Sequence, residues 1–327
     1  MVSLKDIEAS NSRLSEAGEG LVAVFLGATS GIGKATLREF AQRATKPRVY
    51  IVARNAAAIA SQVDELRKLN SGGQFEVIEK NVSLIADANA VAATVLEKET
   101  KVDLLFLSVG FFSFDGRHDT SEGLEASMTT RYYSRIRITQ LLLPLLNAAK
   151  HPRVVSVLAA GHEAQIDESD LSLTKPKSFN VSAGNIHTTT MMTLSLEHMA
   201  RENPQISFVH TFPGIVSTPL LGKTSSGVLG MVLRWAVVPL MALFAMTPAE
   251  AGKRGLFTAT SACYGVDEGL VSLAEGATVA KKSEGGIFLV NQKGEYADND
   301  KVLRGLRERK VGDAVWEHTQ DVFAAIK

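Results

Sequence analysis

The chain has 327 residues, of which 45% are hydrophobic, so it is long enough for one large α/β domain or two small ones. Its 35 basic and 35 acidic residues cancel, which argues against nucleic acid as a general partner. One cysteine, Cys263, excludes a disulfide framework within the chain and a cysteine-rich metal site, and no group of His, Cys and carboxylates has metal-ligand spacing. Residues 1–20 are polar and lack the apolar core of a signal peptide, so we expect a cytoplasmic location.

The first predicted element is a buried strand at residues 21–26, followed by the glycine loop Gly27-x-x-x-Gly31-x-Gly33 and a helix at 34–43. Gly27 allows a tight turn, Gly31 lets the backbone approach a pyrophosphate, and Gly33 lets the helix lie close to its strand. The helix N-terminus adds free N–H groups and the positive end of its dipole. An ordinary strand–turn–helix connection is the alternative, but the order of elements is the one a dinucleotide site requires. We therefore expect cofactor contacts from the three glycines and from the residues between them, Thr29, Ser30 and Ile32.

Short apolar runs then alternate with longer helical stretches along the chain. The expected strands are 49–53, 75–78, 104–107, 154–158, 206–211 and a late edge strand within 285–291, and the expected helices are 56–69, 86–98, 124–146 and 186–201. This alternation predicts a Rossmann-type, doubly wound parallel sheet with helices on both faces. We expect a polar segment at 1–20, one domain over 21–299 and a C-terminal helical extension at 300–327.

The end of the second strand indicates which nicotinamide cofactor is preferred. NAD-dependent enzymes usually place an acidic residue there to hold the ribose diol, whereas this chain reads Ala53-Arg54-Asn55. A guanidinium pairs with a 2′-phosphate through two parallel hydrogen bonds. Arg54 therefore favours NADP(H), the alternative being that it is only a solvated residue at the end of a strand.

The glycine spacing, with Gly-Ile-Gly at its end, resembles the short-chain dehydrogenase/reductase superfamily, and later landmarks agree over about residues 20–300. Ser108-Val109-Gly110 stands where that family has Asn-Ala-Gly, and Phe212–Thr218 resembles its Pro-Gly-x-Val-x-Thr segment beside the nicotinamide. Asn81-Val82 occupies the place of Asp-Val against the adenine, and an asparagine amide can keep that role. The resemblance thus implies further cofactor contacts from Asn81, Val82, Gly110, Pro213, Gly214, Ile215 and Thr218.

The family's catalytic pair, Tyr-x-x-x-Lys, is absent, because none of the 5 tyrosines has a lysine four residues later. That lysine normally lowers the pKa of the tyrosine, which then passes a proton to the substrate oxygen. The resemblance places the pair at Phe179 and Ala183, or one residue later at Asn180 and Gly184. It places Leu158 at the catalytic serine and Arg131 at the active-site asparagine. We therefore expect the fold without the standard proton relay.

Three side chains are candidates to replace that relay. Arg131 could stabilise a developing oxyanion as a fixed cation, or it could be a salt-bridged helix residue. His162 follows Gly161 on the loop that carries the family's serine, and it is a candidate proton donor or base unless it only faces solvent. Tyr133 lies one helical turn before Arg137, whose charge could lower the pKa of the phenol, although this face is rotated away from Arg131.

The segment after the Pro-Gly motif, residues 219–246, is apolar and rich in methionine, and the resemblance makes it the substrate lid. Such a lid favours a hydrophobic small-molecule substrate. A buried helix pair is one alternative, and contact of residues 227–246 with a membrane surface is another. Arg234 and Pro239 interrupt the run and argue against a full span.

The chain also resembles fungal, secondary-metabolite-type members of the superfamily through Tyr132–Arg135, Val154–Leu158 and His210–Gly214. That resemblance implies a biosynthetic role on a hydrophobic natural product, and it leaves a homodimer open. Three functions remain: an NADPH-dependent oxidoreductase with an atypical active site, a non-redox isomerase or cyclase, and a nicotinamide-sensing binding protein. The first is favoured because the segment at 213–218 beside the nicotinamide is retained.

Overall fold

A computed structural model describes residues 2–214, 216, 246–297 and 299–326. Within these residues the chain forms a seven-stranded parallel sheet in the order β3-β2-β1-β4-β5-β6-β7. The strands are β1 (Val22–Leu26), β2 (Arg48–Ala53), β3 (Gln74–Glu79), β4 (Leu104–Leu107), β5 (Arg153–Val157), β6 (Ser207–Thr211) and β7 (Phe288–Val290). This order confirms the predicted doubly wound sheet, and it reverses between β1 and β4, where ligands of such folds bind.

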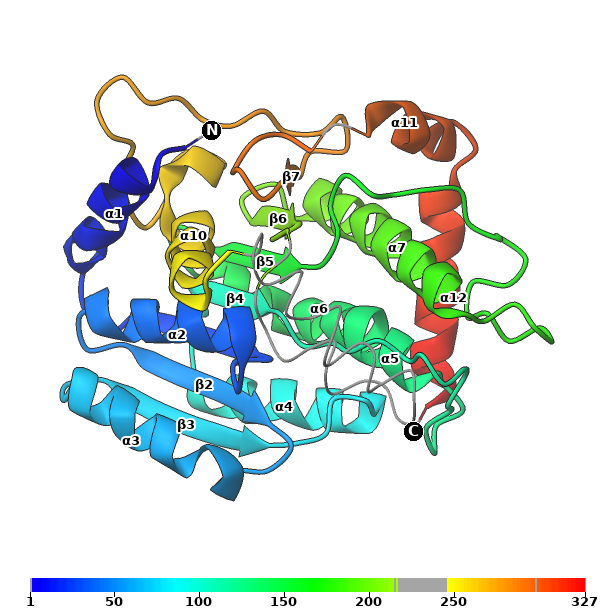
Figure 1. Ribbon diagram of the computed structural model, residues 1–327, viewed down its shortest axis with the longest axis horizontal. Coiled ribbons are helices and arrows are strands. Elements are labelled where there is room, and N and C mark those ends of the chain that lie inside the picture. The colour runs from blue at the N-terminus through cyan, green and yellow to red at the C-terminus, as the bar shows by residue number, and fades with distance from the viewer. Residues whose placement is uncertain (1, 215, 217–245, 298, 327) are drawn as a thin grey trace.

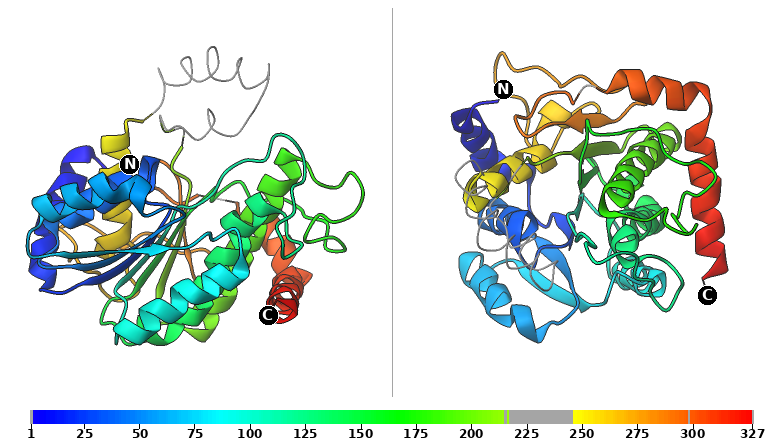
Figure 2. Two further views of the ribbon diagram at one scale, coloured as in Figure 1. Left: turned by 90° about the horizontal axis from the view of Figure 1, so that it is seen from below. Right: turned by 45° about the vertical axis from the view of Figure 1, so that its right-hand side comes forward.

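Helices cover both faces of the sheet, as the two views of Figure 2 show. One face carries α1 (Leu4–Ser12), α2 (Gly31–Arg43), α3 (Ala60–Leu69) and α10 (Pro248–Thr260). The other carries α4 (Ile85–Lys98), α6 (Ser134–Asn147), α7 (Val181–Glu202), α11 (Asp300–Glu308) and α12 (Val311–Ala325). Each face has its own apolar cluster, so the sheet lies between two cores.

The strand sequences explain why both faces are covered. All residues of β1, β4, β5 and β7 are buried. Successive side chains alternate between the two cores: Val22 and Val24 join the cluster under α4 and α6, whereas Ala23 and Phe25 join the cluster under α2 and α10. Continuous apolar runs of this kind are typical of parallel strands buried on both sides.

Two predicted helices differ most from the observed ones, whereas α2 and α3 differ from the expected bounds only by a few residues at their starts. The stretch expected as one helix at 124–146 is divided into α5 (Ala126–Met128), a π-helical turn (Thr129–Tyr133) and α6. Single π-helical turns of this kind often occur at functional sites. Helix α7 begins at Val181 rather than at 186, because the Asn180 side chain accepts a 3.0 Å hydrogen bond from the Ala183 N–H and caps the helix.

The two ends of the chain pack on opposite faces of the molecule. Helix α1 lies against α10, and α12 lies beside α7 (Figure 1). The buried hydroxyl of Tyr132, in the π-helical turn, is 2.7 Å from the Ser195 hydroxyl in α7 and 2.6 Å from the Thr319 hydroxyl in α12. None of the described helices is long and apolar enough to cross a membrane.

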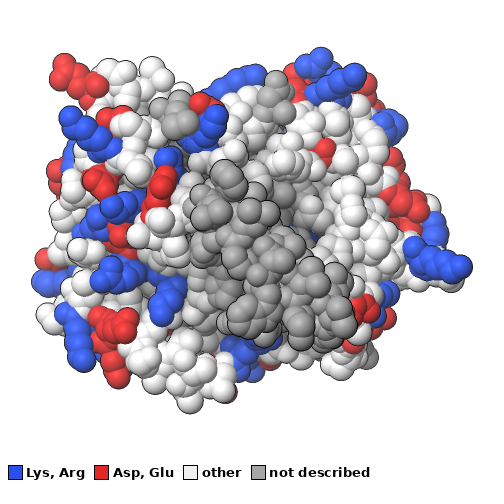
Figure 3. All heavy atoms as spheres, viewed as in Figure 1, with Lys and Arg blue, Asp and Glu red and all other residues white. Residues whose placement is uncertain are grey.

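Charges of both signs are interspersed on the face that Figure 3 shows. Over the helices on the left of this view, Lys and Arg alternate with Asp and Glu, and neither sign forms a separate patch among the described residues. This distribution agrees with the equal numbers of acidic and basic residues.

Candidate cofactor and active site

The glycine loop packs tightly against the end of β4. Gly27 and Gly31 have positive φ angles of 90° and 57°, which side chains rarely allow. A Cβ atom on Gly27 would be 2.3 Å from the Val109 nitrogen, and one on Gly33 would be 2.3 Å from the Ser108 Oγ. The loop therefore needs glycine at these positions, and it presents the N-terminus of α2 at the switch point of the sheet, as a dinucleotide site requires.

Neighbouring side chains fix this loop further. The buried Gln62 amide, in α3, donates a 2.7 Å hydrogen bond to the Ala28 carbonyl. Thr29 and Ile32 are half-buried in the loop and Ser30 is exposed, so all three lie where a bound phosphate could reach them. The residues present fit a nicotinamide dinucleotide.

The adenine side of the site is formed by the ends of β2 and β3. Arg54 directly follows β2 and is exposed. The Glu79 carboxylate, at the end of β3, accepts a 2.8 Å hydrogen bond from the Ala56 N–H. The Asn81 side-chain oxygen accepts a 3.0 Å hydrogen bond from the Ser83 hydroxyl, so Asn81 can offer its amide N–H groups to a base. Val82 is buried behind this turn.

Arg131 lies between the end of β4 and the start of α7, where the sequence placed it in the active site. It is 4% exposed, and a Cβ atom on Gly110 would be 2.8 Å from its Cγ. Its guanidinium carbon lies 4.8 Å from the centre of the Phe112 ring, and its Nη2 donates a hydrogen bond to the Asn185 Oδ1 in α7. Burial lowers the pKa of Arg131 to about 10, although the nearby Glu125 opposes this change.

A second buried arginine, Arg135, lies one turn further along and was not singled out from the sequence. Its Nη1 donates to the Ser156 Oγ at 3.0 Å and to the Val157 carbonyl at 2.8 Å, and its Nη2 donates to the Val109 carbonyl. Burial, with the charge of Arg131, lowers the pKa of Arg135 to about 9. Arg135 thus ties the end of β4 to β5 beneath the candidate active site.

The residues that the resemblance places at the family's proton relay cannot transfer a proton. Leu158 follows β5, and its N–H donates a 2.8 Å hydrogen bond to the Thr211 carbonyl. Leu158, Phe179 and Ala183 are half-buried and pack against the same apolar cluster. In the alternative register the positions are Asn180 and Gly184. The Asn180 side chain caps α7, and a Cβ atom on Gly184 would be 3.1 Å from the Phe179 ring.

His162 lies beside the segment expected to contact the nicotinamide. Its side chain is exposed, and its ring meets the Phe212 ring edge-on at 4.5 Å between centres. Phe212 precedes Pro213 and Gly214. The φ angle of Gly214 is 73°, which favours glycine at this position. Ile215, Thr218 and residues 217–245 of the predicted lid lie outside the described residues.

A buried hydrogen-bond chain that the sequence did not reveal holds the His162 loop in place. The His210 Nε2 accepts from the Ala159 N–H at 3.2 Å, and its Nδ1 donates to the Thr193 Oγ1 at 2.8 Å. Thr193 then donates to the Glu163 Oε1 at 2.7 Å, and the Glu163 Oε2 accepts from the Gly161 N–H at 2.9 Å. Burial, with the charge of Arg135, lowers the pKa of His210 to about 3, and burial raises the pKa of Glu163.

Tyr133 does not join this group. Its hydroxyl is 2.8 Å from the Ser172 Oγ and 3.0 Å from the His318 Nε2, which belongs to α12. Arg137 donates instead to the Asn89 Oδ1 at 2.6 Å, and its guanidinium lies over the Phe323 ring. The expectation that Arg137 lowers the pKa of Tyr133 is wrong, because burial of the phenol raises that pKa.

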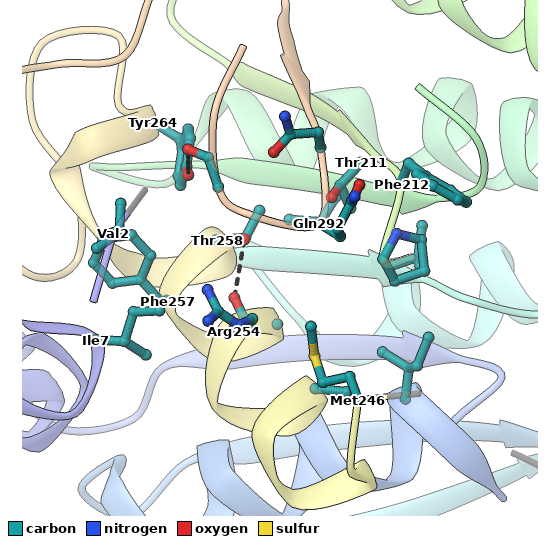
Figure 4. Close-up of a pocket in the computed structure, with 18 of the residues that line it drawn as sticks. Val2, Ile7, Thr211, Phe212, Met246, Arg254, Phe257, Thr258, Tyr264 and Gln292 are labelled. Atoms are coloured by element: carbon teal, nitrogen blue, oxygen red, sulfur yellow. Dashed lines mark hydrogen bonds between the residues drawn. The ribbon is translucent and has the colours of Figure 1, made fainter. Parts of the chain in front are cut away.

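A narrow pocket lies behind the nicotinamide segment, on the side of α10 (Figure 4). Its volume is about 40 Å³, which is room for a few water molecules and too little for a cofactor ring. Ile32 and Phe212 line it, together with Val2 and Ile7 from the N-terminal segment. The Thr258 hydroxyl lies on its wall and donates a 2.9 Å hydrogen bond to the Arg254 carbonyl, drawn as a dashed line in Figure 4.

Comparisons with known proteins agree with this geometry. The oxidoreductase notO of Aspergillus sp. is 45% identical over 99% of this chain and 96% of its own length. Oxidoreductase AN1596 of Emericella nidulans is 38% identical over 99% of this chain and 98% of its own length. The Pseudomonas aeruginosa RhlG/NADP complex superposes with a TM-score of 0.55 and 21% identity, over 75% of this chain and 91% of RhlG. The sequence pattern of the short chain dehydrogenase family matches residues 21–228, and the chain therefore belongs to that family of oxidoreductases.

Proposed function

We propose that the protein is an NADP(H)-binding oxidoreductase that acts on a hydrophobic, natural-product-type small molecule through an atypical active site. The observation that carries this proposal is a tightly packed glycine loop at the switch point of the sheet, in a chain that has no Tyr-x-x-x-Lys pair. Gly27 and Gly33 have no room for a Cβ atom, and we propose that Leu158, Phe179 and Ala183 stand where the family has its proton-transferring side chains. When bound, the nicotinamide would supply or accept hydride.

The preference for NADP(H) rests on Arg54. This residue is exposed at the end of β2, where a guanidinium can meet a 2′-phosphate. The Glu79 carboxylate, at the end of the neighbouring strand β3, accepts a hydrogen bond from the Ala56 N–H. The location of Arg54 therefore supports a positively charged pocket for the additional phosphate of NADP(H).

In this proposal Arg131 and His162 replace the missing relay. Arg131 is a fixed cation at the end of β4 and can stabilise a developing negative charge on a substrate oxygen. His162 is exposed beside Phe212 and can give or take the accompanying proton. The chain from His210 to Glu163 keeps the His162 loop in position.

A hydrophobic substrate is supported by the side chains around Arg131. The Phe112 ring lies against the guanidinium, and Leu158, Phe179 and Ala183 are only partly buried, so they can offer apolar surface in the same proposed site. We propose that residues 21–299 form the cofactor-binding and catalytic domain in the cytoplasm, that 219–246 close over the substrate, and that 300–327 are an extension packed on α7.

Incubation with NADPH and candidate biosynthetic intermediates tests the proposal, with nicotinamide absorbance and product mass followed separately. An oxidoreductase consumes one NADPH for each product whose mass rises by two hydrogens. A product of unchanged mass without NADPH consumption would instead show a non-redox isomerase or cyclase, the alternative that the replaced relay favours. Cofactor binding with no product from any intermediate would favour a nicotinamide-sensing protein.

A further inference from the structure

Arg131 is a buried cation that forms no ion pair with any described carboxylate. It is 4% exposed, and its one hydrogen bond among the described residues goes to a neutral amide, Asn185. Glu125 is the acidic group whose charge acts on it. The Glu125 Oε2, however, already accepts from the Ser127 hydroxyl at 2.6 Å and from the Met128 N–H at 2.7 Å. Arg131 therefore has no direct ion-pair partner among the described residues, although the charge of the buried Glu125 carboxylate, whose Oε1 has no hydrogen-bond partner there, still acts on it from farther away.

The other buried arginines of this core are used differently. Arg135 binds the carbonyls of Val109 and Val157, and Arg153 donates to the carbonyls of Thr258 at 2.7 Å and Ser261 at 3.1 Å. Both therefore join backbone segments. The Nε atoms of Arg135 and Arg153 are buried without a partner, whereas no nitrogen of Arg131 is buried in that way. The remaining N–H groups of Arg131 can thus reach a ligand.

The surroundings of Arg131 make such a ligand favourable. Partly exposed aromatic side chains lie close to the site: the centre of the Phe112 ring is 4.8 Å from the guanidinium carbon, and the Phe179 ring packs on Gly184, next to Asn185. A charge in an apolar environment is unfavourable unless an opposite charge is close to it. A guanidinium also binds carboxylates through paired, charge-assisted hydrogen bonds. A ligand would supply the direct ion-pair partner that Arg131 lacks among the described residues.

We infer that Arg131 binds an anionic oxygen of the substrate, so that the site accepts a hydrophobic molecule carrying a carboxylate. This inference rests on the proposed function, because it names the substrate class of the same site. Asn185 accepts a hydrogen bond from the guanidinium on the side of α7, and the guanidinium lies over the Phe112 ring. Asn185 is therefore a positioning residue for the anion.

Calorimetric titration with naphthoate and with its neutral primary amide, naphthamide, tests this inference, in the presence and absence of NADP⁺. The wild type is expected to bind the acid at least about tenfold more tightly than the amide. Arg131→Gln removes the cation, and Asn185→Asp places a carboxylate of the same size beside it. Both variants should lose the preference for the acid. Arg137→Gln should keep it, because Arg137 lies in the following helix, α6, and donates its hydrogen bond to Asn89.

The inference is overturned if the wild type binds acid and amide equally, or binds neither at millimolar concentration. It is also overturned if acid binding persists in both Arg131→Gln and Asn185→Asp. Arg131→Gln could also lose as much affinity for NADP⁺ as for the acid. That result would assign the guanidinium to a cofactor phosphate and reject the substrate carboxylate. Failure of the proposed function is distinguishable, because a wild type that prefers the acid but binds no NADP⁺ contradicts only the cofactor assignment.

Discussion

Arg307, in α11, donates two hydrogen bonds to the buried carboxylate of Glu197 in α7, at 3.0 Å from Nε and 2.5 Å from Nη2. The Glu197 side chain is 2% exposed and that of Arg307 is 21% exposed. A Cβ atom on Gly285 would lie 1.9 Å from the Glu197 carboxyl carbon, so the backbone before β7 also closes over this pair. The ion pair thus joins the C-terminal extension to the central helix of its face.

Arg307→Ala should lower the free energy of unfolding by about 3 kcal/mol, because it leaves a buried carboxylate without its partner. Urea denaturation followed by circular dichroism measures this change. Arg304→Ala is the matched control, because Arg304 pairs with the exposed Glu284, and it should change stability by less than about 1 kcal/mol. Equal effects of the two substitutions would contradict the structural role of the Glu197 pair.

Arg54→Ala should weaken NADPH binding by about tenfold or more and leave NADH binding unchanged, since only NADPH carries a 2′-phosphate for the guanidinium. Titration calorimetry with both cofactors measures the two affinities. Arg67→Ala, at an exposed position of α3, serves as the control. Equal affinity of the wild type for both cofactors would remove the basis for the preference.

Reduction of simple ketones with NADPH should be absent or very slow, because general acid–base catalysis contributes about 10²–10⁴-fold in rate. The double change Phe179→Tyr with Ala183→Lys should restore a trace of this activity. In the alternative register, Asn180→Tyr with Gly184→Lys should instead destabilise the protein by about 1 kcal/mol through loss of the α7 cap. Rapid ketone turnover by the wild type would reveal an acid at another position.

Arg131→Ala and His162→Ala should each lower turnover of the natural substrate by at least about tenfold, equivalent to about 1.4 kcal/mol of transition-state stabilisation. Steady-state kinetics at saturating NADPH measure the change in kcat. Wild-type rates in both variants would mean that binding geometry alone carries the reaction.

His210 should make stability depend on pH in the acidic range. Burial depresses the pKa of His210 to about 3, whereas its ordinary pKa is near 6.5. When the pH is below that ordinary pKa, the unfolded chain therefore binds a proton that the folded chain does not. Stability is therefore fully present above that value and falls as the pH decreases toward 3, at about 1.4 kcal/mol per pH unit. Unfolding free energies measured across this range should decline less steeply in His210→Gln than in the wild type. The exposed His118→Gln is the control, and parallel curves for wild type and His210→Gln would contradict the assignment.

The sheet and the cofactor loop could be predicted from the sequence because their signals are local. Apolar runs and the spacing of Gly27, Gly31 and Gly33 depend on residues close together in the chain, and the alternation of strands with helices predicted the doubly wound parallel sheet that the structure shows. The absence of Tyr-x-x-x-Lys could also be read directly, since it is a property of spacing.

The surroundings of each candidate side chain, in contrast, were decided by contacts between distant parts of the chain. Arg131 and Tyr133 lie two residues apart on one π-helical turn, yet Arg131 meets Asn185 at the start of α7 and Tyr133 meets His318 in α12. Those partners are 54 and 185 residues away, so spacing within the turn carried no information about them. Burial by these remote elements raised the pKa of Tyr133 and left the cation of Arg131 without an acidic partner among the described residues, and only the packed structure shows either effect.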